Sequence, residues 1–222
     1  MNSSNMQIKV KEKLNLNKRD NIFNNTKSNY IMKQIFNLIN QKRMLDIMKY
    51  SKKMQNRLDK SINTYKEYCE TFTPIEILLL PDKKNYGDFV NIQKEDKSFF
   101  HIYFDNSVKE VKKCDLDKND SVKQIKIIID HKVKSFMNLF ANCSCLNSIS
   151  FIKFYRNNIN NMNKMFFRCS TLKEIKFFNF KTNNVINMGG MFKGCSSLKE
   201  LDLSTFNTEN VKDMNNMFSE CS

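Results

Sequence analysis

The chain has 222 residues, of which 41% are hydrophobic, and 37 Lys and Arg against 23 Asp and Glu give a formal charge of +14. This composition excludes a chain that is disordered throughout, and the length allows one or two domains with a buried core. The basic balance is compatible with binding to nucleic acid or anionic lipid, and equally with the codon bias of an Asn-, Lys- and Ile-rich chain.

Targeting signals are not visible in the sequence. The start, MNSSNMQIKVKEKLNLNKRD, has no apolar core before its charges, and no run approaches the ~20 apolar residues of a spanning helix. We therefore predict an intracellular, cytoplasmic protein without a transmembrane segment. Seven cysteines, an odd number, then indicate free thiols rather than a disulfide framework.

The first half of the chain divides into three regions. Residues 1–28 are polar and predict a flexible arm. Residues 29–70 carry apolar side chains at spacings of three and four, which predicts two or three short amphipathic helices. Residues 71–118 alternate, as in IEILLLP and SFFHIYFD, and predict a small antiparallel β unit in which His101 is structural.

A repeat of 26 residues begins near residue 120 and makes residues 119–222 one further region. Many columns agree in phase, which is the signature of stacked repeats. The clearest columns are Cys143, Cys169, Cys195 and Cys221, and Phe140, Phe166, Phe192 and Phe218.

The spacing within one copy predicts its shape. Leu198, Leu201 and Leu203 alternate as in a strand, whereas Val211, Met214 and Met217 follow a helical or 3₁₀ spacing. Each copy would then be a strand, a turn and a short helical segment, with the strands stacked in parallel. The stretch SVKQIKIIIDHKV fits as a degenerate first coil.

Two copies, MNKMFFRCSTLKEIKFFNFKTNNV and MGGMFKGCSSLKELDLSTFNTENV, resemble BspA-type leucine-rich repeats over roughly residues 120–222. The resemblance implies an α+β chain that ends in a leucine-rich-repeat solenoid of 26-residue coils. The last coil stops after its cysteine, so we expect the chain to be a fragment of a longer repeat protein.

Leucine-rich repeats bind partners on the concave face of their strands, so the resemblance implies a protein-binding surface and no enzymatic activity. The identity of the partner cannot be read from the residues. The side chains expected to face outward between the buried columns are Ser148, Ser150, Ile152, Glu174, Lys176, Phe178, Glu200, Asp202 and Ser204.

The candidate chemical sites each fail a simple requirement, so the sequence predicts no catalytic residue, metal or cofactor. One cysteine per coil does not converge on a metal ion as paired zinc ligands do. The stretch DLDKNDSVKQIK begins like a calcium loop, but Asp120 replaces the Gly of its turn and Lys126 replaces its bidentate Glu.

Two alternative functions remain open. The stretch YIMKQIFNLINQKRMLDIMKYSKKMQNRL, within residues 29–60, resembles an F-box and implies a substrate adaptor of a ubiquitin ligase. The basic arm and helices, including Lys42, Arg43, Lys52, Lys53 and Arg57, instead predict nucleic-acid binding.

Overall fold

The structure is a computed structural model that describes residues 27–30, 32–33 and 51–221, and the chain divides into two compact units, Met1–Tyr68 and Cys69–Ser222. Helix α4 (Lys52–Leu58) lies in the first unit, and α5 (Ile62–Phe72) leads from it into the second. The Ser51 Oγ accepts a hydrogen bond from the Met54 N–H at 3.3 Å, which caps the start of α4. The predicted flexible arm lies almost wholly outside the described residues.

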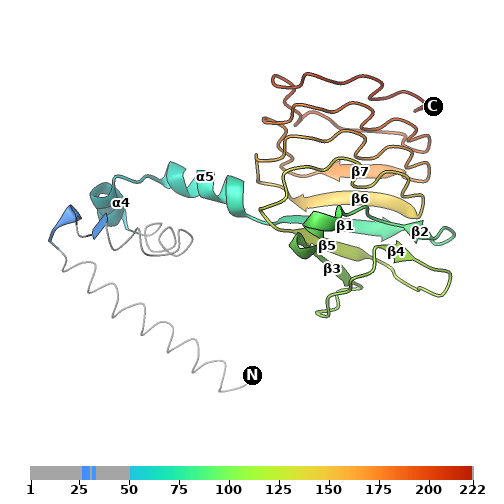
Figure 1. Cartoon of the computed structure of the whole chain (residues 1–222), viewed down its shortest axis with the longest axis horizontal. Helices are drawn as coiled ribbons and strands as arrows, with labels where there is room; N and C mark the ends of the chain where they lie inside the picture. The colour runs from blue at the N-terminus through green and yellow to red at the C-terminus, as the bar shows by residue number, and fades with distance from the viewer. Residues whose placement is uncertain (1–26, 31, 34–50, 222) are drawn as a thin grey trace, which may run out of the picture. The chain divides into compact units, whose positions relative to one another are not determined.

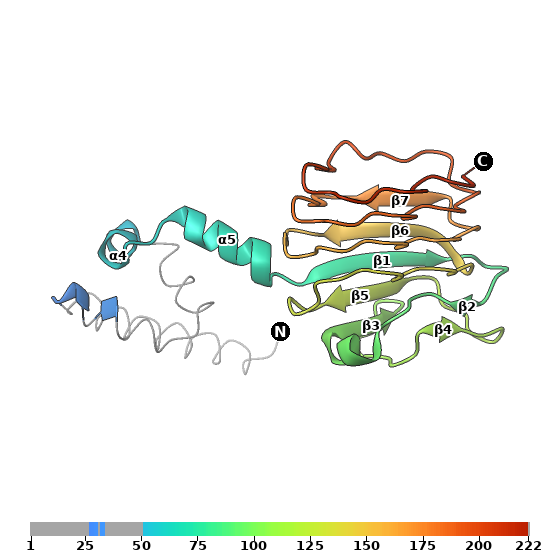
Figure 2. The same ribbon diagram turned by 45° about the horizontal axis from the view of Figure 1, so that its top comes forward.

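A five-stranded sheet in the order β3-β5-β1-β6-β7 organises the second unit (Figures 1 and 2). The pairs β3–β5, β5–β1 and β1–β6 are antiparallel, and β6–β7 is parallel. Two short strands, β2 (Gly87–Asp88) and β4 (Asp115–Leu116), pair separately, and the 3₁₀ helix η1 (Lys94–Phe99) precedes β3. The strands of the main sheet are β1 (Ile75–Pro81), β3 (Phe100–Phe104), β5 (Ile125–Ile129), β6 (Leu146–Lys153) and β7 (Glu174–Phe177).

Alternation along the strands fixes the register of this sheet. The cross-strand neighbours Ile127, Ile77 and Phe151 are each fully buried, because every second side chain points to the same face. Full burial of one such side chain contributes roughly 1.5–3 kcal/mol, so a one-residue slip would be costly. One row crosses all five strands and is half-buried only at its last member: Ile102, Ile127, Ile77, Phe151 and Phe177.

The predicted fold class is wrong. The strands do not divide into a small antiparallel unit and a parallel leucine-rich-repeat solenoid, because β1 lies between β5 and β6 and joins them in one mixed sheet. The predicted first coil does contain β5, but β5 does not adjoin β6. Strand β1 lies beside β6 at the position where a preceding repeat strand was expected. Its apolar run has the same alternating buried face as a repeat strand.

The third copy also departs from the prediction. Leu198–Leu203 is not a strand, and no backbone hydrogen bond joins residues 198–205 to β7 within the described part of the chain. The Met- and Phe-rich stretches are not helical either. They are consecutive turns, which we call the turn segments, at residues 135–143, 161–169, 187–195 and 213–221.

Left-handed residues explain why helical spacing produced turns. In the second turn segment Lys164 and Arg168 have φ of 53°, and the same two columns are left-handed in all four turn segments. A helix cannot contain such residues, so each segment closes with bonds from the N–H of residue i+3 to the carbonyl of residue i, as in Met165 to Met162. At Gly194, where φ is 76°, an added Cβ would lie 3.0 Å from the Arg168 Cγ. The two columns are Asn138, Lys164, Gly190 and Asn216, and Asn142, Arg168, Gly194 and Glu220.

Backbone hydrogen bonds join each turn segment to the next with a constant polarity. The N–H groups of alternate residues donate toward the C-terminal neighbour, as in Phe166 to the Met191 carbonyl at 2.9 Å. The carbonyls of the intervening residues accept from the N-terminal neighbour. Between the second and third segments the donors Met162, Lys164, Phe166 and Arg168 meet the acceptors Asn187, Gly189, Met191 and Lys193. The same four columns are joined in the other two interfaces.

Side-chain ladders follow the same period. The rings of Phe166 and Phe192 stack with centroids 5.4 Å apart, and Phe192 and Phe218 stack at 5.6 Å. The Cys195 thiol donates to the Phe166 carbonyl at 3.1 Å. Side-chain oxygens of one further column cap the turns: Ser135, Asn161, Asn187 and Asp213. Each accepts a hydrogen bond from the backbone N–H of the residue two positions later, as Asn187 does from Gly189 at 2.9 Å. The apolar side of each segment therefore packs against its neighbours in the stack, and the ring of Phe166 also contacts Phe151 of β6 and Phe177 of β7.

Asn91 closes the N-terminal end of the stacked turn segments. Its N–H donates to the Leu139 carbonyl at 2.7 Å, and its Nδ2 donates to the Ala141 carbonyl at 2.7 Å and the Asn138 carbonyl at 3.1 Å. Asn91, which lies outside the repeat, thus supplies hydrogen-bond donors to the Leu139 and Ala141 carbonyls. In the later segments the carbonyls of these two columns accept from the preceding segment instead.

Candidate binding surface

The outer face of the five-stranded sheet is the candidate binding surface. It consists of the side chains that point away from the buried rows. Leu78, at the centre of β1, lies opposite Lys126 of β5 and Ser150 of β6, and Ser150 in turn lies opposite Lys176 of β7. These side chains are half-buried or exposed, so the described residues leave the face open to solvent.

The residues predicted on β6 and β7 meet on this face with one exception. The register places Ser148 beside Glu174 and Ser150 beside Lys176. Ser148 is only 5% exposed and is buried opposite Leu80, so it is not available to a partner. The Lys176 Nζ lies 2.9 Å from the Glu174 carboxylate, an ion pair between half-exposed side chains that contributes little to stability.

Ile152 and Phe178 form the most exposed apolar part of the surface. They are 41% and 52% exposed and occupy the same column of neighbouring repeats. The Phe178 N–H donates to the Phe151 carbonyl at 3.3 Å, which holds Phe178 next to the end of β6. Ile152 lies in a register shift of the β1–β6 pair, where Phe151 opposes Ile77 and Lys153 opposes Glu76. Such bulges redirect side chains.

Glu200, Asp202 and Ser204 are exposed, but they do not lie on a strand of the sheet. The Ser204 N–H donates to the Asp202 carboxylate at 2.8 Å. The hydroxyl and N–H of Ser204 together lower the pKa of that carboxyl. Among the described residues, no backbone hydrogen bond joins the stretch that holds these three residues to β7.

Sequence reasoning missed the contribution of β1 to this face. Glu76 bridges two neighbouring strands, with its carboxylate 2.9 Å from the Lys126 Nζ and 2.5 Å from the Lys153 Nζ. Burial raises the pKa of Glu76, but the two lysines outweigh burial and hold it below its usual value. The alternation in IEILLLP could have shown which residues face outward. Nothing in it showed that the strand inserts between β5 and β6.

The buried thiols of the repeat are structural. Cys169 donates to the Phe140 carbonyl at 2.9 Å, and Cys195 donates to the Phe166 carbonyl at 3.1 Å. Burial raises the pKa of Cys195 to about 12 and that of Cys145 to about 11, and it also raises the pKa of Cys169. Nucleophilic and metal-binding thiols need the opposite shift, so these residues stay protonated.

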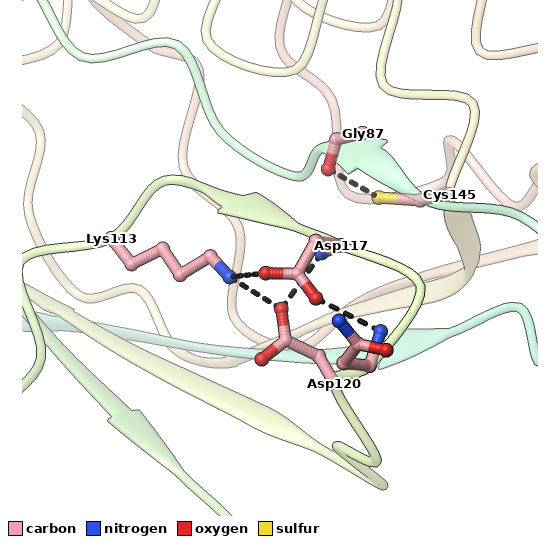
Figure 3. Close-up of polar contacts among 6 residues, drawn as sticks. Gly87, Lys113, Asp117, Asp120 and Cys145 are labelled. Atoms are coloured by element: carbon pink, nitrogen blue, oxygen red, sulfur yellow. Dashed lines mark hydrogen bonds and ion pairs between the residues drawn. The ribbon is translucent and has the colours of Figure 1, made fainter.

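A lysine fills the calcium-like loop. The Lys113 Nζ lies 2.8 Å from the Asp117 carboxylate and 2.5 Å from the Asp120 carboxylate, as Figure 3 shows. The lysine lowers the pKa of Asp117, and the Asn119 N–H donates to the same carboxylate. The ammonium neutralises the carboxylates that a calcium ion would need. A pocket of about 800 Å³ lies beside this cluster, lined by the chain around Asp82–Tyr86 and Leu116–Lys123.

Within residues 27–30, 32–33 and 51–221, no group of three or more His, Cys, Asp or Glu side chains is placed to hold a metal ion. In the same residues no helix has the length and apolar character needed to cross a membrane.

The structure describes only some of the residues behind the two alternative functions, F-box-like adaptor and nucleic-acid binding. Most of the F-box-like stretch, together with Lys42 and Arg43, lies outside the described residues. Lys52 and Lys53 are exposed on α4, and the Arg57 Nε donates to the Asn29 side chain at 2.9 Å.

Comparison with known families corrects the resemblance to BspA-type leucine-rich repeats. Residues 132–222 match a family model described as Mycoplasma protein of unknown function, DUF285, and no BspA or leucine-rich-repeat family is found. The match covers less than half of the chain and includes all four turn segments. No curated protein and no solved structure matches the chain.

Proposed function

We propose that the chain is a non-enzymatic protein-interaction module that binds a partner protein on the outer face of its five-stranded sheet. The observation that supports this most is the exposed pair Ile152 and Phe178, adjacent on the surface at the ends of β6 and β7. Exposed apolar groups that cluster are more often interaction sites than scattered ones are.

The charges around this pair fit a partner contact. Lys153 and Glu76 are paired, as are Lys176 and Glu174, so binding would leave no isolated charge at the centre of the interface. Leu80, at 39% exposure, and the half-buried Leu78 extend the apolar area along β1. A partner that presents aliphatic or aromatic side chains, with polar groups at its rim, would match this arrangement.

Charge substitutions on the face test the proposal. Proteins captured from a lysate of the source organism by the wild-type chain should be lost with Ile152→Asp and Phe178→Asp, because each change puts a charge into an apolar contact. The loss of affinity should be roughly 10- to 100-fold, as for truncation of interface anchors. Ile186→Asp is the matched control, since Ile186 is 45% exposed but lies outside the sheet.

The proposal fails if both face variants capture the same proteins as the wild type. It also fails if Ile186→Asp loses the same proteins, because the effect would then not be specific to the face. Retention of nucleic acid at low salt that disappears steeply as salt is added would support the nucleic-acid alternative instead.

A further inference from the structure

The pocket beside the calcium-like loop is formed by two loops next to the short β2–β4 pair. The first loop, residues 82–86, joins β1 to β2, and the second, residues 117–124, joins β4 to β5. The pairing of Gly87 with Leu116 holds the adjoining ends of the two loops together. The volume of the pocket, about 800 Å³, lies within the range of ~300–1,000 Å³ that is typical of small-molecule sites.

Hydrogen bonds fix the ends of both loops. The Asp82 N–H donates to the Cys145 carbonyl at 2.7 Å, and the Cys145 thiol donates to the Gly87 carbonyl at 3.4 Å, as Figure 3 shows for the thiol. One residue of the repeat thus holds both ends of the first loop. In the second loop the Lys123 N–H donates to the Asp105 carboxylate at 2.8 Å. Because the walls are held in place, a ligand would lose little affinity to the ordering of the loops.

Lysine side chains give the pocket its charge. The lining includes four exposed lysines, and none of them forms an ion pair with a carboxylate of the described residues. They come from both walls: Lys83 and Lys84 from the first loop, and Lys118 and Lys123 from the second.

The three carboxylates in the same lining already have donors. Asp117 and Asp120 share the Lys113 ammonium at 2.8 and 2.5 Å. The Asp82 carboxylate accepts from the Lys84 N–H at 2.8 Å. Because Lys113 offsets the two acidic groups of the calcium-like loop, the remaining lysines favour an anion rather than a cation in the pocket.

Tyr86 adds an aromatic ring to the pocket. Its side chain is 51% exposed, and the Lys118 ammonium of the other loop lies 5.2 Å from its ring centre. Leu116, Val122 and Pro81 form the apolar part of the lining. A ligand with a planar ring can therefore stack on Tyr86 while its charged groups meet the lysines.

We propose that this pocket binds a small phosphorylated molecule that carries a planar ring, as a nucleoside triphosphate does. The phosphates would lie between the lysines of the two loops, because an ammonium binds phosphate as a point charge with freely rotating donors. The ring would lie against Tyr86. This inference does not depend on the proposed function of the sheet face, because the pocket includes neither Ile152 nor Phe178.

ATP without magnesium is the probe, added to the full chain at low salt. It should shift the amide resonances of residues 82–86 and 117–123 in a saturable way and leave those of Ile152 and Phe178 unchanged. The affinity should fall as salt is added, because the contacts to the exposed lysines are screened. Adenosine, which lacks the phosphates, should bind at least about tenfold more weakly than ATP.

Substitutions at exposed side chains test the charge and the ring separately. Lys83→Glu and Lys118→Glu should each weaken ATP binding roughly tenfold, since each change replaces an attraction by a repulsion. Lys134→Glu is the matched control, because Lys134 is exposed but lies outside the pocket. Tyr86→Ala should weaken ATP binding about tenfold and leave the binding of inorganic triphosphate unchanged, whereas Tyr86→Phe should retain ATP binding.

The proposal is overturned if millimolar ATP shifts none of these amides, or if Lys134→Glu weakens binding as much as Lys118→Glu does. It is also overturned if Tyr86→Ala binds ATP as tightly as the wild type, because the ring would then contribute nothing. A single-stranded oligonucleotide that shifts the same amides when ATP does not would show a nucleic-acid surface instead.

Discussion

Replacing Lys164 tests whether the repeated Met- and Phe-rich segments are turns or helices. Lys164 has φ of 53°, and its ammonium lies 5.6 Å from the Phe167 ring centre. Lys164→Ala and Lys164→Gly both remove that ring contact, so the difference between the two variants isolates the backbone. In a helix the Gly variant would be less stable than the Ala variant by about 1 kcal/mol.

The turn conformation predicts the opposite sign. Relief of the left-handed strain of a residue with a Cβ contributes roughly 1–2 kcal/mol. The greater conformational entropy of Gly in the unfolded chain lowers the stability of the Gly variant by about 0.5–1 kcal/mol. We therefore expect Lys164→Gly to be more stable than Lys164→Ala by about 0.5–1 kcal/mol, measured by urea unfolding followed by circular dichroism.

The control site for this comparison is Lys134, which is exposed and does not have a positive φ. There Lys134→Gly should be less stable than Lys134→Ala by about 0.5–1 kcal/mol. A Gly variant less stable than the Ala variant at both sites would refute the left-handed turn at Lys164.

Three further predictions concern the end cap and the thiols. Asn91→Ala should lower the free energy of unfolding by about 1–3 kcal/mol, because the Asn138 and Ala141 carbonyls lose their side-chain donor. Urea unfolding measures this change. The control is Asn119→Ala at an exposed side chain that makes no such contact, and it should change the free energy of unfolding by less than about 0.5 kcal/mol. Alkylation at pH 8 should leave Cys143, Cys169 and Cys195 unmodified in the native chain while it modifies the exposed Cys221, which mass spectrometry of the intact and digested protein would show. Because the pKa of Cys145 is raised from 9.0 to about 11 on folding, the unfolded chain loses this proton first, so stability should fall as pH rises above about 9. Rapid labelling of the buried cysteines, or stability that rises over this pH range, would contradict the assignment.

The 26-residue period was readable from the sequence because residues in the same column meet the same neighbours. The Phe and Cys columns are apolar and in phase, and the structure stacks the rings and buries the thiols of the inner segments. The alternation in IEILLLP and SFFHIYFD likewise gave strands, since one face of each had to be buried.

The conformation within each repeat was misread because spacings of three and four occur both in helices and in successive turns. The deciding signal was the Asn and Gly residues in the two left-handed columns, such as Asn138 and Gly190. Lys164 and Arg168 in the same columns concealed that signal, since neither residue favours a left-handed backbone. The column that caps the turns was overlooked because its residue type varies, as Ser135, Asn161, Asn187 and Asp213 show.

The sequence by itself determined the repeat, its buried columns and the outward direction of Ile152 and Phe178, because these depend on periodicity along one chain. Only the tertiary structure decided that β1 lies between β5 and β6 and that Asn91 closes the first turn segment. Each of these depends on which distant segment supplies the missing hydrogen bonds. Local pattern cannot specify that choice, because strands with the same alternation compete for one edge.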